Sequence, residues 1–371
     1  MTMNYYMPTK VVAGENCVFD NRSLFKEIGK KALIVTGRTS AKESGSLDDA
    51  VRALEANGQA YTLFDEVTAN PAAACAFDAA AVAKREECDF VIAMGGGSPM
   101  DLGKAAAAIA VNPVLPDAFF TTPFDKALPV IAVPTTAGTG SEVTQYAIFT
   151  NDAVQSKSSL SSPALFPRIA FLDARYLLSL SRNTAVNTAL DALSHAVEGM
   201  LGVRASVFTD AAAKSGIRIF AECLPAIKSG SFDDPAVREK LLYAAALDGM
   251  VIANTGTTVV HAMGYSLTYF RDVPHGRANA LLLGAYLRFV QRKEKDAGTN
   301  RVGEILGALG MKSLDEFDAV IDGFLGVREK FTAAEIERYA GIAVHAKHIA
   351  NGTVKPDKAD LVEVLTTSLG G

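Results

Sequence analysis

A change of pattern near residue 180 constrains the fold more than any other feature of this sequence. Before it, short apolar runs rich in β-branched residues predict strands at 31–37, 60–64, 89–94 and 129–134. Helical patterns lie between these runs at 46–57, 72–87 and 101–111. Strands that alternate with helices indicate βαβ units and a parallel sheet, in which ligands bind beyond the carboxyl ends of the strands.

After residue 180, β-rich runs become rare and long amphipathic helical patterns replace them. These patterns cover 183–201, 205–229, 235–253 and 277–293. We therefore predict two domains: an α/β domain at residues 1–179 and an all-α domain at residues 180–371.

Composition and charge exclude several classes of protein. Lys and Arg number 36 against 41 Asp and Glu, so the net charge of −5 lacks the basic footprint of a nucleic-acid binder. No apolar run reaches the ~20 residues that a membrane span needs. The first residues show no secretory pattern, and the four cysteines form no C-x-x-C pair. We expect a cytoplasmic protein with reduced thiols, without nucleic-acid or membrane partners.

Two loops follow predicted strands and are rich in glycine or threonine. Residues 95–101 (GGGSPMD) follow the third strand and open a helix, which suits a phosphate because glycine permits close approach and a helix N-terminus presents free N–H groups. Residues 135–142 (TTAGTGSE) follow the fourth strand. Two such loops in one sheet favour a dinucleotide site. A plain strand-to-helix turn and a hydroxyl-rich turn are the alternatives.

The end of the first predicted strand bears on the choice of nucleotide. NAD sites usually place a carboxylate near the adenosine ribose, but Gly37 offers none. Arg38, Thr39 and Ser40 could instead meet a 2′-phosphate. This pattern favours NADP(H) over NAD(H), with a solvated loop charge as the alternative for Arg38.

Five histidines occur in the chain, and the first of them follows an aspartate by four residues. Asp191 and His195 share one face of a predicted helix whose other residues are mostly apolar. An exposed pair is the commoner explanation of this spacing, but burial of an unpaired charge would be costly.

Two further histidines could complete a metal site. In one straight helix His261 and His275 would lie roughly 21 Å apart, at ~1.5 Å per residue. Pro274 cannot continue a helix, so a turn there can fold His275 back toward His261. With Asp191 and His195 they would offer one oxygen and three nitrogens, a set that suits Fe(II) or Zn(II). Spacing alone leaves shared and separate roles equally open. For His345 and His348 we expect a structural or surface role.

Taken together, these motifs closely resemble those of the iron-containing (group III) alcohol dehydrogenases. The resemblance rests on residues 95–101, on 134–144 (PTTAGTGSEVT), on 191–198 (DALSHAVE), and on His261 and His275 in the same order and spacing. It covers essentially the whole chain. It implies an N-terminal dinucleotide-binding domain with a parallel sheet and an all-helical C-terminal domain, the dehydroquinate synthase-like fold.

The resemblance also implies roles for individual residues. Asp191, His195, His261 and His275 would bind a catalytic divalent metal, usually Fe(II) and in some cases Zn(II) or another ion. The cofactor contacts would be Gly96, Gly97 and Ser98 at the pyrophosphate, Asp101, Thr135, Thr136, Thr139 and Thr144 near the nicotinamide, and Lys157 at a ribose. Members with Thr-Gly at 36–37 resemble the NADP-using branch, and members are commonly homodimers.

One departure concerns the residue four positions after His261. Many members carry a further histidine there, whereas this chain has Tyr265, which could relay a proton or bind the substrate.

We predict reversible hydride transfer between NADP(H) and a small primary alcohol or aldehyde. A glycerol or polyol dehydrogenase is one alternative. A dehydroquinate synthase-like lyase is another, although few basic residues surround His261 and His275 to hold a substrate phosphate. The third is a nucleotide-binding protein without catalysis.

Overall fold

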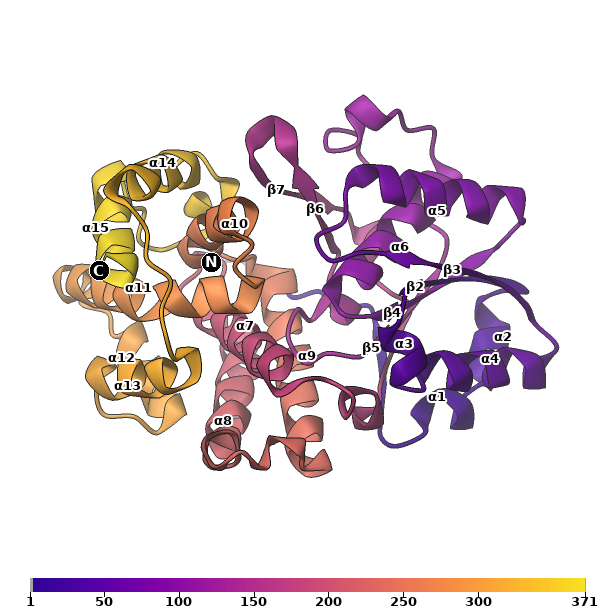
Figure 1. Ribbon diagram of the computed structural model, residues 1–371, viewed down its shortest axis with the longest axis horizontal. Coiled ribbons are helices and arrows are strands. Elements are labelled where there is room, and N and C mark those ends of the chain that lie inside the picture. The colour runs from indigo at the N-terminus through magenta and orange to yellow at the C-terminus, as the bar shows by residue number, and fades with distance from the viewer. Residues whose placement is uncertain (1–2, 371) are drawn as a thin grey trace. The chain divides into compact units, whose positions relative to one another are not determined.

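The computed structural model describes residues 3–370 and divides into two compact units. The first unit is Met7–Ser181, and the second begins at Arg182 and also contains residues 3–6. Figure 1 shows strands covered by helices in the first unit and packed helices in the second. The predicted combination of an α/β part with a parallel sheet and a helical part is therefore confirmed.

The sheet of the first unit has six parallel strands in the order β1-β8-β5-β4-β2-β3. Their bounds are β1 Lys10–Ala13, β2 Lys31–Gly37, β3 Ala60–Val67, β4 Phe90–Gly95, β5 Val130–Pro134 and β8 Ile169–Leu172. Every residue of β4, β5 and β8 is buried, as expected for strands covered on both faces. The carboxyl ends of β4 and β5 lie side by side, with Gly95 paired to Pro134.

The four predicted strands are present, with small shifts at their ends. β2 has the predicted bounds, while β3 extends three residues further. The prediction omitted β1 and β8, which have only four residues each and show no alternation to detect. It also omitted an antiparallel hairpin of β6 Tyr146–Asn151 and β7 Ser156–Ser161, whose serine-rich sequence does not look like a strand.

Helices cover both faces of the sheet, with α5 and α6 on one side and α1–α4 on the other (Figure 1). Their bounds are α1 Cys17–Asp20, α2 Ser23–Ile28, α3 Ser40–Glu43, α4 Ser46–Asn57, α5 Ala73–Arg85 and α6 Gly97–Val111. The Ala-rich sequences of α5 and α6 allow these helices to pack closely in the core beneath β2 and β4. α6 begins at Gly97, four residues before the predicted start, directly after the glycine loop.

The second unit is built from nine helices among the described residues. They are α7 Arg182–Met200, α8 Val207–Ser229, α9 Pro235–Thr255, α10 Val259–Arg271, α11 His275–Ala297, α12 Arg301–Leu309, α13 Leu314–Leu325, α14 Ala333–Ala343 and α15 Lys358–Leu369. α7 packs against α8, α9 and α11, and fourteen of its nineteen residues are buried. In a helix that is buried on most sides, each polar side chain costs free energy of folding unless it has a hydrogen-bond or charge partner.

Residues 3–6 belong to the helical unit although they precede the first strand. The backbone N–H of Tyr6 donates to Asn254 Oδ1 on α9 at 2.8 Å. The ring of Tyr5 lies 5.9 Å from that of Phe208 on α8. The chain therefore passes from the helical unit to the α/β unit at residue 7 and returns at residue 182.

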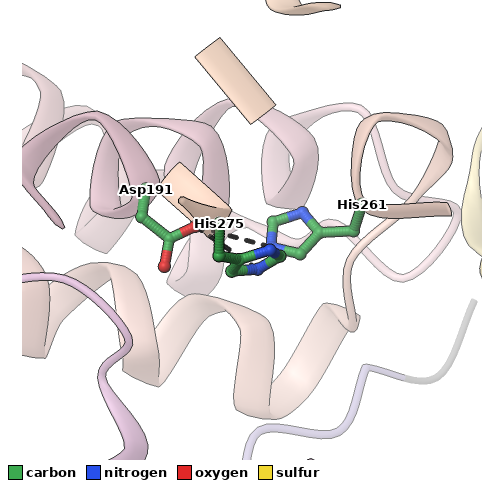
Figure 2. A group of neighbouring side chains, drawn as sticks. All are labelled: Asp191, His261 and His275. Carbon is green, nitrogen blue, oxygen red and sulfur yellow. Dashed lines mark ion pairs between the residues drawn. The ribbon is translucent and has the colours of Figure 1, made fainter. Parts of the chain in front are cut away.

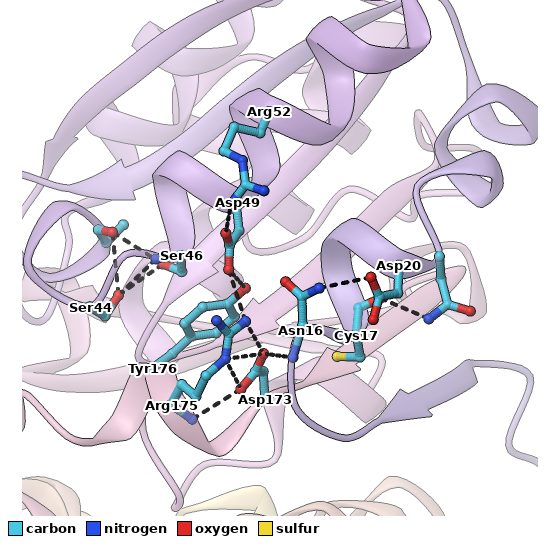
Figure 3. A network of polar contacts seen from close by, with 12 residues as sticks. Asn16, Cys17, Asp20, Ser44, Ser46, Asp49, Arg52, Asp173, Arg175 and Tyr176 are labelled. Atoms are coloured by element: carbon cyan, nitrogen blue, oxygen red, sulfur yellow. Dashed lines mark hydrogen bonds and ion pairs between the residues drawn. The ribbon is translucent and has the colours of Figure 1, made fainter.

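A polar network joins the loop after β1, the end of β8 and α4 (Figure 3). Fully buried Asp173 accepts hydrogen bonds from the N–H of Asn16 at 2.7 Å and from the backbone and side chain of Arg175. Asp49 accepts from Tyr176 Oη at 2.8 Å and from Arg175 at 3.0 Å. Both buried carboxylates are thus paired, which fixes the strand ends at this side of the sheet.

Candidate functional site

The helical unit brings four predicted metal ligands together. Asp191 and His195 lie one turn apart on α7 with their side chains buried, and Asp191 Oδ1 is 3.9 Å from His195 Nε2. Asp191 Oδ1 also lies 3.8 Å from His261 Nε2 and 3.6 Å from His275 Nε2 (Figure 2). His195 Nε2 and His261 Nε2 are 3.1 Å apart.

A sharp break between α10 and α11 allows His261 and His275 to meet. α10 ends at Arg271, Asp272 adopts a left-handed conformation with φ of 50°, and α11 begins at His275 directly after Pro274. The start of α11 packs directly on α7, because a Cβ at Gly276 would lie 1.9 Å from the carbonyl oxygen of Asn187. This contact places His275 beside Asp191 and leaves no room for a larger residue at 276.

The donor set fits a divalent transition metal. Four ligands in a tetrahedron with bonds of about 2.1 Å lie about 3.4 Å from one another. The four separations given above, 3.1 to 3.9 Å, lie on both sides of that value, so small adjustments would bring the atoms to it. Atoms of Asp191, His261 and His275 all lie within 4.8 Å of one another. One carboxylate oxygen with imidazole nitrogens suits iron or zinc better than calcium or magnesium, which prefer oxygen ligands.

The charge of Asp191 fits the same role. Burial raises the pKa of its carboxyl, but His275, His195 and His261, together with a hydrogen bond from Asn279, outweigh burial and lower the pKa to about 2. The carboxylate is therefore ionised at neutral pH and available as an anionic ligand.

Glu198 orients His261 and was given no role in the sequence analysis. It is fully buried on α7, and its Oε1 accepts hydrogen bonds from the backbone N–H and hydroxyl of Thr258, both at 2.8 Å. Its Oε2 pairs with His261 Nδ1. A proton held on Nδ1 leaves the lone pair of Nε2 free for a metal, the arrangement of many carboxylate–histidine metal sites.

The pKa of Glu198 agrees with this contact. Burial raises the pKa of this carboxyl, but the interactions with His261 and Thr258 outweigh burial and lower it. A buried glutamate three residues after His195 was the available signal in the sequence, but its partner lies 63 positions away.

Asn279 is a second residue that the sequence analysis did not select. It lies one turn after His275 on α11, and its Nδ2 is 2.9 Å from Asp191 Oδ1. The same nitrogen lies 3.2 Å from His261 Nε2 and 3.4 Å from His275 Nε2. The amide therefore faces the ligand cluster and can orient the carboxylate of Asp191.

Tyr265 lies beside the ligands, one turn after His261 on α10. Its ring stacks on that of His275 with centroids 5.4 Å apart, and it meets the ring of His261 edge-on at 6.1 Å. The ring of His348 also meets it edge-on at 5.4 Å. His348, expected to be structural or on the surface, is thus a neighbour of the cluster.

In the α/β unit, the two predicted cofactor loops touch each other. Gly95 ends β4 with φ of 134°, Gly96 precedes α6, and no side chain caps the N-terminus of that helix. A Cβ at Gly97 would lie 2.7 Å from Thr139 Cγ2, so the two loops pack without space for a side chain there. Uncapped N–H groups beside small residues fit the phosphates of a dinucleotide.

The other predicted cofactor residues of this unit lie around the same sheet edge. Thr135 follows β5 and donates its N–H to the carbonyl of Gly95 at 2.9 Å, and the methyl of Thr136 would touch a Cβ at Gly96. Lys157 on β7 donates to Asn70 Oδ1 at 2.8 Å, while the N–H of Asn70 donates to Ser98 Oγ. Asn70 is an additional residue of this group.

Residues 37–40 lie at the carboxyl end of β2. Thr36 on β2 pairs with Met94 on β4, so this end of β2 is next to the glycine loop. Gly37 ends the strand, Arg38 and Thr39 are exposed, and Ser40 begins α3. The structure thus places these residues at the edge where the prediction put the nucleotide.

Asp101 and Thr144 contact a buried lysine that the sequence analysis did not select. Lys104 on α6 is fully buried, and its Nζ donates to the carbonyl of Ser141 at 2.9 Å and to that of Thr144 at 3.3 Å. Its Nζ lies 3.3 Å from Asp101 Oδ1, and Asp101 in turn accepts a hydrogen bond from Ser141 Oγ at 2.5 Å. Lys104 and Asp101 therefore hold the threonine loop against α6.

Comparisons with known proteins identify the family of both parts of the chain. The family model described as iron-containing alcohol dehydrogenase matches residues 8–174, and that for the C-terminal part of the Fe-containing family matches residues 185–369. The 1,3-propanediol dehydrogenase of Klebsiella pneumoniae is 34% identical over 328 residues, which is 86% of this chain and 82% of that protein. The lactaldehyde reductase of Escherichia coli K12 is 34% identical over 264 residues, 70% of this chain and 68% of that protein.

Solved structures give the same result. An iron-containing alcohol dehydrogenase from Thermotoga maritima has a TM-score of 0.90 with 34% identity over the whole of both chains. A sulfoacetaldehyde reductase from Bifidobacterium kashiwanohense, solved with NAD+, has a TM-score of 0.88 with 27% identity and covers 100% of this chain and 99% of that one. Among the described residues, no helix is both long and apolar enough to cross a membrane.

Proposed function

The chain belongs to the iron-containing alcohol dehydrogenase family of oxidoreductases, and from that premise we propose that it interconverts small primary alcohols and aldehydes with NADP(H). The observation that carries this proposal is the convergence of Asp191, His195, His261 and His275. Membership in a family of dehydrogenases sets aside the lyase that the sequence left open.

Four side chains would hold the metal, and two more would prepare them. Asp191, His195, His261 and His275 supply the ligand atoms, Glu198 keeps the proton of His261 on Nδ1, and Asn279 orients the carboxylate of Asp191. A divalent metal held there supplies Lewis-acid chemistry that lowers the pKa of an alcohol hydroxyl toward neutrality. Fe(II) is the ion we propose, although Zn(II) and other divalent metals suit the same ligands.

The α/β unit would hold the dinucleotide. Gly96, Gly97 and Ser98 would meet the pyrophosphate at the N-terminus of α6, and the threonines of residues 135–144 would flank the nicotinamide, which supplies the hydride acceptor. Gly37 with Arg38, Thr39 and Ser40 supports NADP(H), because no carboxylate stands at position 37. Lys157 would contact a ribose.

Tyr265 would complete the substrate side of the cluster. Its ring lies against His275, so its hydroxyl can bind the substrate or pass on a proton. We also propose a cytoplasmic homodimer, which light scattering on the purified protein would test.

Anaerobic turnover tests the proposal. The purified protein, reconstituted with Fe(II), is assayed on alcohols and aldehydes of two to six carbons with NADP(H) and NAD(H) side by side, and with a chelator as control. Chelator-sensitive turnover that favours NADP(H) is expected. Turnover that favours NAD(H) would keep the enzyme class and overturn the role of Gly37, and no turnover with either nucleotide would overturn the function.

A further inference from the structure

Glu198 caps the N-terminus of α10 with the oxygen that does not contact the ring of His261. Besides the contacts with Thr258, its Oε1 accepts hydrogen bonds from the backbone N–H of Val260 at 3.0 Å and from that of His261 at 3.3 Å. The first N–H groups of a helix have no partner within the helix, and a capping side chain normally supplies one. Here the cap of α10 comes from α7, because the hydroxyl of Thr258, the residue before α10, also turns toward Glu198.

The two oxygens of this carboxylate therefore have separate tasks. Oε1 meets Thr258 and the start of α10, while Oε2 pairs with Nδ1 of His261. The terminal torsion of a glutamate side chain is soft, so the plane of the carboxylate is fixed only by the bonds that its oxygens make. The bonds to Oε1 consequently decide whether Oε2 faces the ring of the metal ligand.

The turn that carries Thr258 is also held by contacts that do not involve Glu198. The carbonyl of Thr257 accepts a hydrogen bond from Asn351 Nδ2 at 2.9 Å. A Cβ at Gly256 would lie 2.7 Å from the same nitrogen, so the turn packs closely against Asn351. Loss of the hydroxyl of Thr258 should therefore leave the turn in place and release only Glu198.

We propose that Thr258 is a positioning residue for the metal site: its hydroxyl holds Glu198 in the orientation that keeps Nε2 of His261 available to the metal. This inference rests on the ligand set proposed above. The side chain of Thr258 is fully buried, and its hydroxyl lies 2.8 Å from a charged acceptor, a setting that strengthens a hydrogen bond. Thr258 thus raises metal affinity through Glu198 and His261, without itself being a ligand.

The test measures metal affinity rather than turnover. The dissociation constant of Zn(II), which has no redox chemistry, is determined by competition with a chelator for the metal-free wild-type protein and for Thr258→Val, which keeps the shape but removes the hydroxyl. Thr258→Ala serves if the Val variant does not fold, and Thr258→Ser keeps a hydroxyl. Thr255→Val is the matched control, since Thr255 is equally buried and its hydroxyl lies 3.0 Å from the carbonyls of Val251 and Gly256.

A Zn(II) dissociation constant that rises about 3- to 10-fold in Thr258→Val supports the inference, since that factor corresponds to one hydrogen bond. The constants of Thr258→Ser and Thr255→Val should stay close to that of the wild type. An equal rise in Thr255→Val would reveal a general effect of removing a buried hydroxyl and overturn the inference. An unchanged constant in Thr258→Val overturns the role of Thr258 and leaves the metal site in place. Failure of the wild type to bind Zn(II) overturns the proposed ligand set and the inference with it.

Discussion

The metal-ligand cluster and the glycine–threonine loops use different parts of the chain to prepare a binding site. In the helical unit, side chains from three helices orient the ligands: Glu198 holds His261, and Asn279 holds Asp191. In the α/β unit, the backbone dominates, with glycines at the N-terminus of α6 packed against the threonine loop. A side-chain site depends on long-range packing, whereas a backbone site is largely fixed by where strands end. Substitutions should therefore affect metal binding and nucleotide binding separately.

Loss of a metal ligand should produce the largest effect. His261→Ala removes one nitrogen and leaves the carboxylate of Glu198 without its partner, so we expect the protein to retain little metal and turnover to fall by more than the ~100-fold typical of outer-shell substitutions. Metal content by mass spectrometry and NADPH binding by fluorescence would check this. NADPH binding should persist, and His345→Ala is the control. Full turnover in metal-free His261→Ala would contradict the assignment.

Removal of Lys104 should disturb the other site. Lys104→Met leaves Asp101 buried without its cation and several carbonyls without a donor, which should cost about 3–5 kcal/mol of stability. The KM for the nucleotide should rise because the threonine loop is no longer held against α6. Denaturant unfolding and nucleotide titration would measure both effects, with exposed Lys84→Met as the control. An unchanged nucleotide KM would show that the loop does not need this lysine.

A smaller effect is expected when the orientation of His261 is weakened. Glu198→Gln keeps the shape but removes the charge that holds the Nδ1 proton, so metal affinity should fall about 10- to 100-fold. Competition with a chelator would measure the affinity, and exposed Glu337→Gln should leave it unchanged. A variant with wild-type affinity for metal but altered nucleotide affinity would show that Glu198 serves nucleotide binding and does not prepare His261 for the metal.

The smallest effect concerns pH and Glu142 in the threonine loop. Burial raises the pKa of Glu142 from 4.5 to about 7. Its own backbone N–H and the charge of Lys104 lower the pKa, but burial outweighs both. Because the pKa is higher in the folded protein than in the unfolded chain, protonated Glu142 contributes to the stability of the fold. This contribution is complete below pH 4.5 and is lost as the pH rises to about 7. Glu142→Gln should therefore be more stable than wild type by about 1–3 kcal/mol at pH 8 and similar at pH 4.5. Thermal unfolding at both values, with Glu55→Gln as control, would show whether this difference exists.

Sequence patterns predicted the elements that are long or sharply bounded. β2 ends at Gly37 as predicted, and the helical structure is interrupted before Pro274 as predicted, although no helix was predicted at the residues of α10. Short edge strands such as β1 carry too few residues for a pattern, and the serine-rich β7 is a strand only because β6 pairs with it. A local sequence pattern cannot predict a strand that forms only through pairing with another strand.

The same division applies to the candidate sites. The glycine loop and the pair Asp191 and His195 were visible because their spacing is local. Glu198 and Lys104 were not selected, because the partners that give them meaning, His261 and the carbonyls of residues 141–146, become neighbours only on folding. His348 looked like a surface residue for the same reason, since Tyr265 lies far from it in the sequence.

The placement of residues 3–6 on the helical unit has a practical consequence for protein engineering. A gene split at residue 182 would give a helical fragment that lacks residues 3–6. That fragment would lose the hydrogen bond from Tyr6 to Asn254 and the contact of Tyr5 with Phe208. The other fragment would carry two tyrosines without their partners, which invites self-association. A circular permutant that fuses residues 3–6 to the end of α15 and opens the chain at residue 7 would keep each unit continuous.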